Sequence, residues 1–353
     1  MELYEKNGNA IYILNVLKKY SDEYHYLQVS DIKEKVLEEY EVDIDPRTIR
    51  RIINLLKEKL EYDISTRAEN KKGYYLIKDP DTDFERGEIR AIIDTFSYAT
   101  YITPKISKSI INKCINMQNI YEQERFKDYH VYSSSNKTSN MEVIKNLEDI
   151  SEAIYKKKKI TFQYQKYDLR KNKLEIKVVD DPVVSPYAIA YNDQEFYLIC
   201  LKNKMDKLYS YRIDRMKDVT LLKNEASDTF SKKDVEQFMK SSVSMFAGET
   251  TKITVRCKMF LLDNMVDVFG SDLEFKRVDD EHFECTLEIN KDGMKYWVLR
   301  NIENVEVISP VSFQKEIKKI LKERSWRSFF VDTLCDQYHC STFQKKIEWK
   351  HER

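Results

Sequence analysis

The stretch from Ser185 to Met216 constrains the fold of this chain more than any other, because it has the pattern of three short strands in succession. Residues 187–191 end at an Asn-Asp pair, which tolerates the backbone angles of a turn. Residues 196–201 are apolar throughout, as in a strand that is covered on both faces. Residues 208–216 alternate apolar or aromatic side chains with polar ones, so that strand has one apolar and one polar face. We predict a small sheet here.

Two arginines, Arg212 and Arg215, lie in the polar part of this sheet among several tyrosines. A guanidinium binds phosphate or carboxylate through parallel hydrogen bonds, and tyrosine hydroxyls can orient such a group. We therefore expect a ligand-binding site for an anion, made of Tyr164 (the weaker candidate), Ser185, Tyr187, Tyr197, Arg212 and Arg215. Two alternatives stay open. The tyrosines, Tyr197 above all, could be core residues, and Arg215 could pair with Asp214 or Asp218 inside the domain.

The triplet Phe196-Tyr197-Leu198 after a Pro-Tyr strand, followed by Tyr211-Arg212-Ile213-Asp214-Arg215, resembles the core of the WYL domain. That family is named for a Trp-Tyr-Leu triplet, from which Phe196 departs. The resemblance implies an Sm/SH3-like barrel whose polar face binds a regulatory ligand. A helical stripe before Lys156 and strand patterns at 160–165 and 174–179 complete one helix and five strands. We expect a five-stranded β-barrel domain over residues 141–225.

Composition sets limits on the other functions. The length of 353 residues predicts two or three domains, and 60 basic residues balance 60 acidic ones, so any nucleic-acid signal must be local. Neither a membrane span nor a signal peptide is expected, which predicts a cytoplasmic protein with no membrane partner. The spacing of the six cysteines indicates no disulfide framework, so reduced thiols are expected. With no phosphate-binding glycine loop, His-Glu-x-x-His motif or Gly-x-Ser-x-Gly elbow, we expect no catalytic residues, no metal and no cofactor.

The first 78 residues have the pattern of a winged helix-turn-helix. Helices are expected at residues 9–20, after an N-cap at Ser30, and at residues 46–60, where Asp45 caps and Pro46 opens the helix. The apolar face of the third helix is formed by isoleucines and leucines. Its other side carries polar and basic residues, namely Arg47, Thr48, Arg50, Arg51, Asn54 and Lys57.

The basic residues are concentrated on this third helix. Residues 1–78 contain 14 basic and 15 acidic side chains, yet residues 47–59 contain five basic and one acidic. Recognition helices present N-terminal arginine and asparagine to base edges. Residues 64–77 are expected to form a hairpin, the wing, with Arg67, Lys71 and Lys72 near phosphates. A solvated basic face is the alternative. The Arg-Thr-Ile-x-Arg run and the Gly-Tyr also resemble winged-helix modules that precede WYL domains.

The remaining segments are read from periodicity. Residues 79–140 are predicted to be a connector with two helices and a flexible linker at 133–140, and its apolar stripes could pack on a second copy or on neighbouring domains. Residues 226–323 have the order β-α-β-β-α-β of a ferredoxin-like domain, which resembles the C-terminal extension of WYL regulators. Residues 324–353 have no assigned role. Cys335, His339 and Cys340 lack a fourth ligand for zinc, so structural or free thiols are favoured.

These observations predict an α+β protein and a DNA-binding transcription regulator. Its expected partners are double-stranded DNA, a second copy in a homodimer, and an anionic or nucleotide-like effector. A nucleic-acid-acting enzyme would need clustered carboxylates, and the acidic residues of the barrel region show no such spacing. An RNA-binding protein is the other alternative, since Sm-like barrels also bind single strands.

Overall fold

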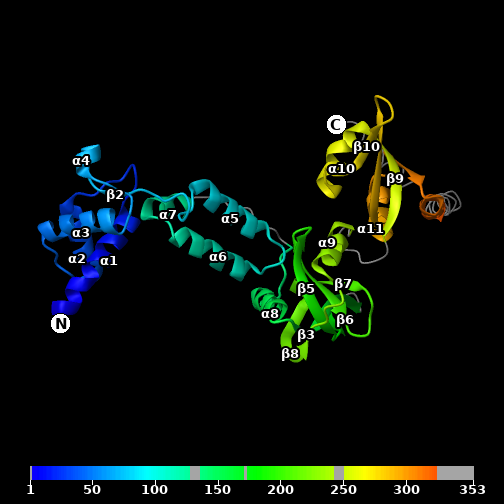
Figure 1. Cartoon of the computed structure of the whole chain (residues 1–353), viewed down its shortest axis with the longest axis horizontal. Helices are drawn as coiled ribbons and strands as arrows, with labels where there is room; N and C mark the ends of the chain where they lie inside the picture. Colours follow the sequence, from blue (N-terminus) through cyan, green and yellow to red (C-terminus); the bar gives the residue numbers. More distant parts are fainter. Residues whose placement is uncertain (1, 128–135, 171–172, 242–249, 324–353) are drawn as a thin grey trace, which may run out of the picture. The chain divides into compact units, whose positions relative to one another are not determined.

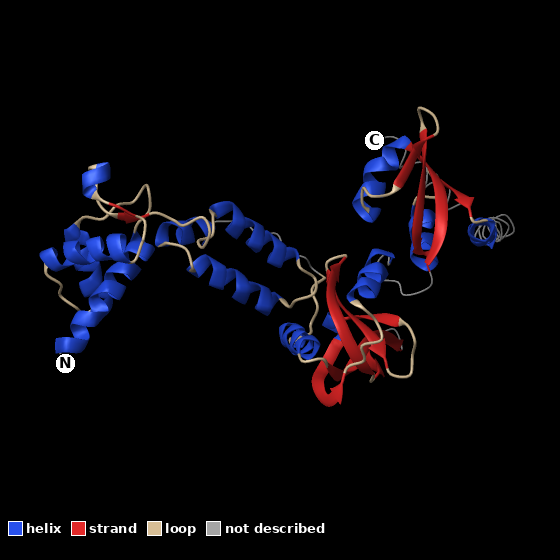
Figure 2. Cartoon of the chain, in the orientation of Figure 1, coloured by secondary structure: helices blue, strands red, loops and turns tan. Residues whose placement is uncertain are grey.

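The computed structural model describes residues 2–127, 136–170, 173–241 and 250–323 (Figure 1). The chain divides into two compact units, residues 1–144 and 145–353. In Figure 2 the first unit is mainly helical, while the second contains the larger sheets. The α+β class predicted from the sequence is confirmed.

The first unit begins with a three-helix domain. Its helices are α1 (Glu2–Tyr20), α2 (Val29–Tyr40) and α3 (Pro46–Lys59). They share a core that contains Ile13, Leu17, Ile32, Val36, Ile49, Ile53 and Leu56. Asp45 caps α3 as predicted. Ser30 does not cap α2, because that helix begins at Val29 and its N-cap is Gln28, two residues earlier; the Gln28 amide donates to the Asp31 carboxylate at 2.8 Å.

The wing is more compact than the predicted hairpin. Strands β1 (Ile64–Ser65) and β2 (Tyr75–Leu76) pair antiparallel, and the helical turn α4 (Arg67–Asn70) lies between them. The Asn70 side chain accepts hydrogen bonds from the Lys72 and Gly73 amides and donates to the Gly73 carbonyl. This closed turn fixes the wing, because it satisfies the backbone groups that no strand pairs.

Gly73 lies where the wing crosses the segment before α2. Leu27 and Tyr74 exchange two backbone hydrogen bonds of 2.8 Å there, and a Cβ on Gly73 would lie 2.7 Å from the Leu27 carbonyl oxygen. We expect Gly73→Ala to lower the free energy of unfolding by about 1–3 kcal/mol, because the wing must move away from Leu27. Gly87→Ala is the matched control, since nothing lies within 4 Å of its added Cβ. Equal melting temperatures for the two variants would contradict this explanation.

The connector helices are α5 (Arg86–Tyr98), α6 (Pro104–Asn116) and α7 (Ile120–Lys127). Ile89 and Ile93 of α5 and Phe126 of α7 are buried together, and Ile111 and Cys114 of α6 pack against them. Much of the apolar surface of these helices is therefore used inside the connector.

Part of the predicted linker is fixed to α5. The Lys137 ammonium donates to the carbonyls of Phe96 at 2.9 Å and Ala99 at 2.6 Å, at the carboxyl end of that helix. The Thr138 amide donates to the Thr100 carbonyl at 2.8 Å. The expectation of a flexible linker is wrong for residues 136–140, because these bonds tie them to the helix end. Residues 133–135 lie outside the described residues.

The second unit opens with helix α8 (Val143–Tyr155) and a curled antiparallel sheet. Its strands are β3 (Lys158–Arg170), β4 (Lys173–Asp180), β5 (Val183–Asn192), β6 (Glu195–Lys202), β7 (Leu208–Arg212) and β8 (Met216–Glu225). The order is β4-β3-β5-β6-β7, and β8 pairs with β3. The buried Asn146 side chain of α8 donates to the Met216 carbonyl at 2.9 Å and so fixes the helix to β8.

This sheet has six strands, so the predicted number of five is wrong. A 3-10 turn at Ile213–Arg215 interrupts the single strand that was expected over residues 208–216, and the chain then continues as β8. The turn between β5 and β6 also lies one residue later than predicted. Asp193 and Gln194 have positive φ angles of 48° and 62°.

After α9 (Lys232–Ser241), the last domain follows the predicted ferredoxin-like order. Its elements are β9 (Thr250–Lys258), α10 (Leu262–Phe269), β10 (Glu274–Arg277), β11 (His282–Asn290), α11 (Lys291–Arg300) and β12 (Val305–Ser309), and residues 311–323 are also helical. All sheet neighbours are antiparallel in the order β10-β11-β9-β12.

Within the described part of the chain, no helix is long and apolar enough to cross a membrane. Cys114, Cys200, Cys257 and Cys285 are free thiols. Cys335, His339, Cys340 and the rest of residues 324–353 lie outside the described residues.

Candidate DNA-binding and ligand-binding sites

The outer face of α3 presents unpaired basic side chains. Arg47, Arg50, Arg51 and Asn54 are exposed, while Ile49, Ile52, Ile53 and Leu56 on the opposite side are buried. Among the described residues, none of these three guanidinium groups makes a hydrogen bond or an ion pair. Thr48 is half-buried between them, and the Asp45 carboxylate accepts from the Arg47 amide at 2.8 Å. The amphipathic pattern of α3 therefore leaves three arginines, whose guanidinium groups can bind base edges, exposed in the first half of the helix.

The wing adds further cations beside α3. Arg67, Lys71 and Lys72 are exposed, and the Lys72 ammonium lies 5.5 Å from the centre of the Tyr26 ring. Lys57, by contrast, already has partners. Its ammonium donates to the Ile64 carbonyl at 3.0 Å and to the Glu69 carboxylate, so it attaches α3 to the wing.

The pKa of Glu69 reflects that attachment. The hydrogen bond from Lys57, together with those from the Thr66 amide and hydroxyl, lowers the pKa of Glu69 to about 2. Lys57 was predicted to contact DNA. In this structure its ammonium attaches α3 to the wing, because both of its acceptors belong to the wing.

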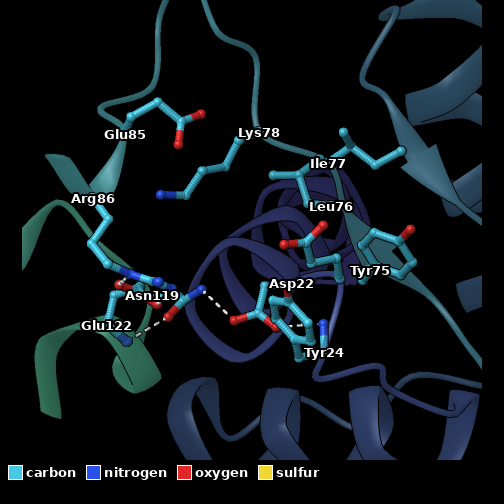
Figure 3. Close-up of a pocket in the computed structure, with 11 residues that line it drawn as sticks. Asp22, Tyr24, Tyr75, Leu76, Ile77, Lys78, Glu85, Arg86, Asn119 and Glu122 are labelled. Carbon is cyan, nitrogen blue, oxygen red and sulfur yellow. Dashed lines mark hydrogen bonds and ion pairs between the residues drawn. The ribbon is translucent and has the colours of Figure 1, made fainter. Parts of the chain in front are cut away.

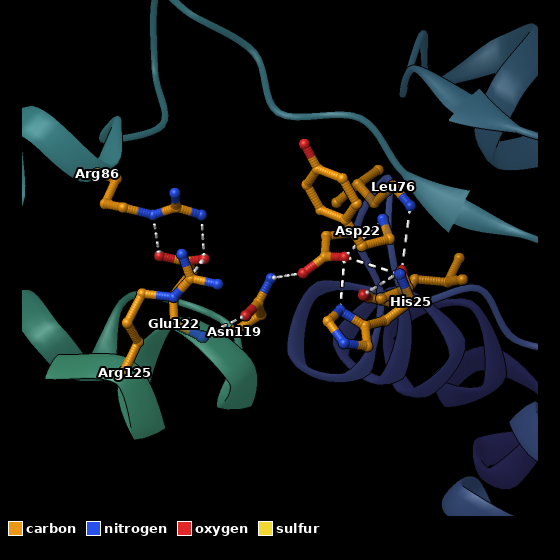
Figure 4. Close-up of polar contacts among 10 residues, drawn as sticks. Asp22, His25, Leu76, Arg86, Asn119, Glu122 and Arg125 are labelled. Atoms are coloured by element: carbon orange, nitrogen blue, oxygen red, sulfur yellow. Dashed lines mark hydrogen bonds and ion pairs between the residues drawn. The ribbon is translucent and has the colours of Figure 1, made fainter. Parts of the chain in front are cut away.

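A chain of polar contacts joins the three-helix domain to the connector (Figure 4). The Asp22 carboxylate accepts from the amides of Tyr24 and His25 and from the His25 ring. Its second oxygen accepts from the Asn119 side chain at 3.0 Å. The His25 ring also stacks on Tyr121 of α7, with centroids 3.5 Å apart.

Asn119 is connected to α5 through Glu122. The side-chain oxygen Oδ1 of Asn119 accepts from the Glu122 amide at 2.9 Å and so caps α7. Glu122 binds Arg86 of α5 through two hydrogen bonds of 2.8 and 2.7 Å, and these lower the pKa of the Glu122 carboxyl. The buried Glu122 thus connects α7 to α5.

A cleft of about 400 Å³ lies beside this network, in the first unit (Figure 3). Its walls come from the segment at Asp22, from β2 and the residues after it, and from the starts of α5 and α7. Lys78 extends toward it, but its ammonium already donates to the Phe84 carbonyl and to Gln118 at 3.0 Å. The lining cations thus have partners from the chain itself.

In the second unit, three of the predicted ligand-binding residues come together. Tyr197 of β6 is the cross-strand partner of Arg212 of β7, and the Arg212 amide donates to the Tyr164 hydroxyl at 3.4 Å. The Tyr164 ring packs edge-on against Tyr211 at 4.9 Å. Burial raises the pKa of Tyr164 and of Tyr197, so both hydroxyls stay protonated at neutral pH and can donate to an anion.

The guanidinium of Arg212 is already occupied by carboxylates. It donates to both oxygens of Asp214 at 2.9 Å and to Glu195 at 2.6 Å. The side chains of Asp214 and Glu195 are 8% and 10% exposed, so two carboxylates with little water around them share the single positive charge of Arg212.

Arg215 differs from Arg212 in this respect. It is half-buried in the 3-10 turn after β7, and within the described residues its guanidinium has no hydrogen bond or ion pair. It directly precedes Met216, which is the strand partner of Tyr164 between β3 and β8. Among the described residues no ion pair joins Arg215 to Asp214 or to Asp218, and the Asp214 carboxylate binds Arg212.

Ser185 and Tyr187 hold another part of the domain. The Ser185 hydroxyl is buried and accepts from the Ser227 amide at 2.9 Å, and the Tyr187 hydroxyl accepts from the Phe230 amide at 3.4 Å. Both therefore fix the segment that follows β8. Of the six predicted ligand-binding residues, Tyr164, Tyr197 and Arg215 keep groups that could meet a ligand.

The family model of the WYL domain matches residues 145–221, which cover α8 and most of the curled sheet. The chain carries a WYL domain. The WYL match includes all six of the predicted ligand-binding residues. No curated protein matches the chain.

Solved structures similar to the chain include the following two. One is proteasome accessory factor B/C (PafBC) of Arthrobacter aurescens, with 11% identity, a TM-score of 0.25, and 94% of this chain and 49% of that chain covered. The chain thus spans about half the length of PafBC. The other is a CRISPR Cas-related protein, with 14% identity, a TM-score of 0.37, and 92% and 85% covered. Both TM-scores are too low to bear on function.

Two sets of residues were missed by the sequence reading. Glu195 and Asp214 bind Arg212, and Asp22, His25, Asn119 and Glu122 connect the two parts of the first unit. Asn119 followed three residues later by Glu122 is a helix-start pattern, so that cap could have been found. The partners of Arg212 and Asp22 depend on strand register and helix packing, which the sequence does not display.

Proposed function

We propose that the chain is a DNA-binding transcription regulator whose WYL domain binds an anionic ligand. The observation that carries this proposal is the outer face of α3 beside a basic wing. Arg47, Arg50 and Arg51 in the first half of the helix are exposed and unpaired among the described residues, and Asn54 is exposed further along the same helix. Free arginine and asparagine at the start of a helix suit the major groove, where they can bind guanine and adenine edges. Arg67, Lys71 and Lys72 would bind phosphates beside the groove.

The deciding experiment compares nucleic acids directly. DNA fragments that co-purify with the full chain would be sequenced, and the recovered duplex would be titrated by fluorescence anisotropy beside a scrambled duplex, single-stranded DNA and RNA of equal length. We expect the recovered duplex to bind at least roughly a thousandfold more tightly than the scrambled one. Preference for RNA would favour the RNA-binding alternative, and cleavage of the DNA in magnesium would favour a nuclease.

For the ligand, the proposal rests on Arg215, whose guanidinium has no hydrogen bond or ion pair among the described residues and which precedes Met216, the strand partner of Tyr164. We expect Arg215→Ala to weaken binding of an anionic ligand roughly tenfold or more, because a charge-assisted contact contributes about 1.5–3 kcal/mol. The probes are a panel of mononucleotides and short oligonucleotides, measured by calorimetry and by their effect on affinity for the recovered duplex. Arg170→Ala is the control, since that arginine is exposed on the same sheet and pairs with Asp168. A wild-type response in Arg215→Ala would place the ligand elsewhere.

Within the first unit, the contacts from Asp22 to Arg86 would couple the connector to the three-helix domain. A ligand-induced change that reaches the connector would act on α7 and α5, and His25 and Asp22 would carry it to the three-helix domain. We also propose a homodimer, because one recognition helix covers one half-site. A two-fold dimer would bind two half-sites about 10–10.5 bp apart, or a multiple of that, in an inverted repeat.

A further inference from the structure

The hairpin of β3 and β4 carries an exposed apolar face. Tyr167 opposes Ile176 and Leu169 opposes Leu174, and opposed residues share one face of a sheet. These four side chains are 61%, 53%, 69% and 68% exposed. Strand β4 lies at the edge of its sheet, and its residues 173–179 are all exposed. An exposed apolar edge strand is a template for another strand.

The free edge of β4 offers backbone groups in a known pattern. Opposed pairs of an antiparallel ladder alternate between hydrogen-bonded and non-hydrogen-bonded, and we assign Arg170 with Lys173, Asp168 with Glu175 and Lys166 with Lys177 to the hydrogen-bonded set. The amides and carbonyls of the alternate residues, Leu174, Ile176 and Val178, therefore point away from β3. They are available to a further strand.

The charged face of this hairpin is mismatched within one chain. Lys166 opposes Lys177, and Asp168 opposes Glu175, so like charges face each other across the two strands. Directly opposed like charges destabilise a sheet. The arrangement becomes favourable when a second β4 is added.

We propose that β4 pairs antiparallel with β4 of a second copy, about a two-fold axis at Ile176. In this register Leu174 opposes Val178 of the second copy, and Ile176 opposes its own counterpart, through the outward backbone groups. Glu175 then opposes Lys177 of the second copy, and Lys177 opposes its Glu175. The sequence Leu-Glu-Ile-Lys-Val is thus self-complementary in both charge and apolar character. This inference names the surface of the homodimer proposed above and rests on that proposal.

Charge reversal tests the register. We expect Lys177→Glu and Glu175→Lys each to weaken self-association of the full chain by roughly tenfold, because two attractive pairs become repulsive. The double variant, with both changes, should dimerise as the wild type does. Sedimentation velocity over a range of concentrations measures this. Within one chain Lys177→Glu faces Lys166 and removes a like-charge pair, so its melting temperature should not fall.

Two further variants separate this surface from others. Ile176→Pro removes the central outward amide and leaves the hydrogen bonds to β3, so it should be monomeric with a near-normal melt. Lys166→Glu removes the same like-charge pair from the β3 side and should leave the dimer unchanged. If the wild type dimerises but Lys177→Glu and Ile176→Pro dimerise equally well, the homodimer stands and the β4 surface is wrong. A wild-type chain that is monomeric at tens of micromolar would overturn both.

Discussion

Replacing Arg47, Arg50 and Arg51 together by alanine is expected to abolish specific binding to duplex DNA. Each arginine that holds a guanine edge contributes about 1–3 kcal/mol of discrimination, so three losses would remove most of a typical specific affinity. The physical reason is that these guanidinium groups make no hydrogen bond or ion pair to the described residues. They are therefore available to DNA without first breaking an internal contact.

The single variants distinguish base contacts from phosphate contacts. A residue that reads a base relaxes the preference at one position, whereas a phosphate contact weakens all sequences alike and reduces the salt dependence. Anisotropy titrations with single-base variants of the recovered duplex, at two salt concentrations, measure both effects. Lys59→Ala is the control, because it removes one charge from the exposed end of the same helix. Unchanged affinity in the triple variant would exclude α3 as the recognition helix.

Arg212→Ala is expected to destabilise the WYL domain by about 3–5 kcal/mol, since it leaves the nearly buried carboxylates of Glu195 and Asp214 without their cation. This is a large fraction of the stability of a typical domain. Chemical denaturation followed by tyrosine fluorescence or circular dichroism measures the loss. By contrast, Arg215→Ala should change stability by no more than about 0.5 kcal/mol, because its guanidinium has no partner among the described residues.

A compensating variant separates charge burial from a role in ligand binding. Adding Glu195→Gln and Asp214→Asn to Arg212→Ala removes the uncompensated charges, so much of the lost stability should return. If Arg212→Ala were as stable as the wild type, the ion pairs would contribute nothing to the free energy of unfolding. The wild-type Arg212 could then exchange its carboxylate partners for a ligand without loss of stability. The two arginines of the third predicted strand would then have equivalent roles, as the sequence alone had indicated.

The sequence by itself determined the parts that depend on local pattern. The Asp45-Pro46 start and the apolar spacing of residues 49–56 predicted α3 and its outward basic face, because a helix places residues by a fixed angle along the chain. The βαββαβ order of the last domain was predicted in the same way, because segments with the hydrophobic period of a strand alternate along the chain with segments that have the period of a helix. The triplet at Phe196 and the Tyr211–Arg215 run predicted the WYL domain that the family model matches.

Tertiary structure alone decided which polar groups meet. Arg212 and Arg215 are three positions apart and look equivalent in the sequence, yet strand pairing brings Glu195 to Arg212 while the 3-10 turn leaves Arg215 unpaired among the described residues. Asp22 and Asn119 are separated by 97 positions and meet only because α7 packs beside the first helix. A hydrogen bond needs two atoms within about 3 Å, and that proximity depends on register and packing, which are properties of the folded chain.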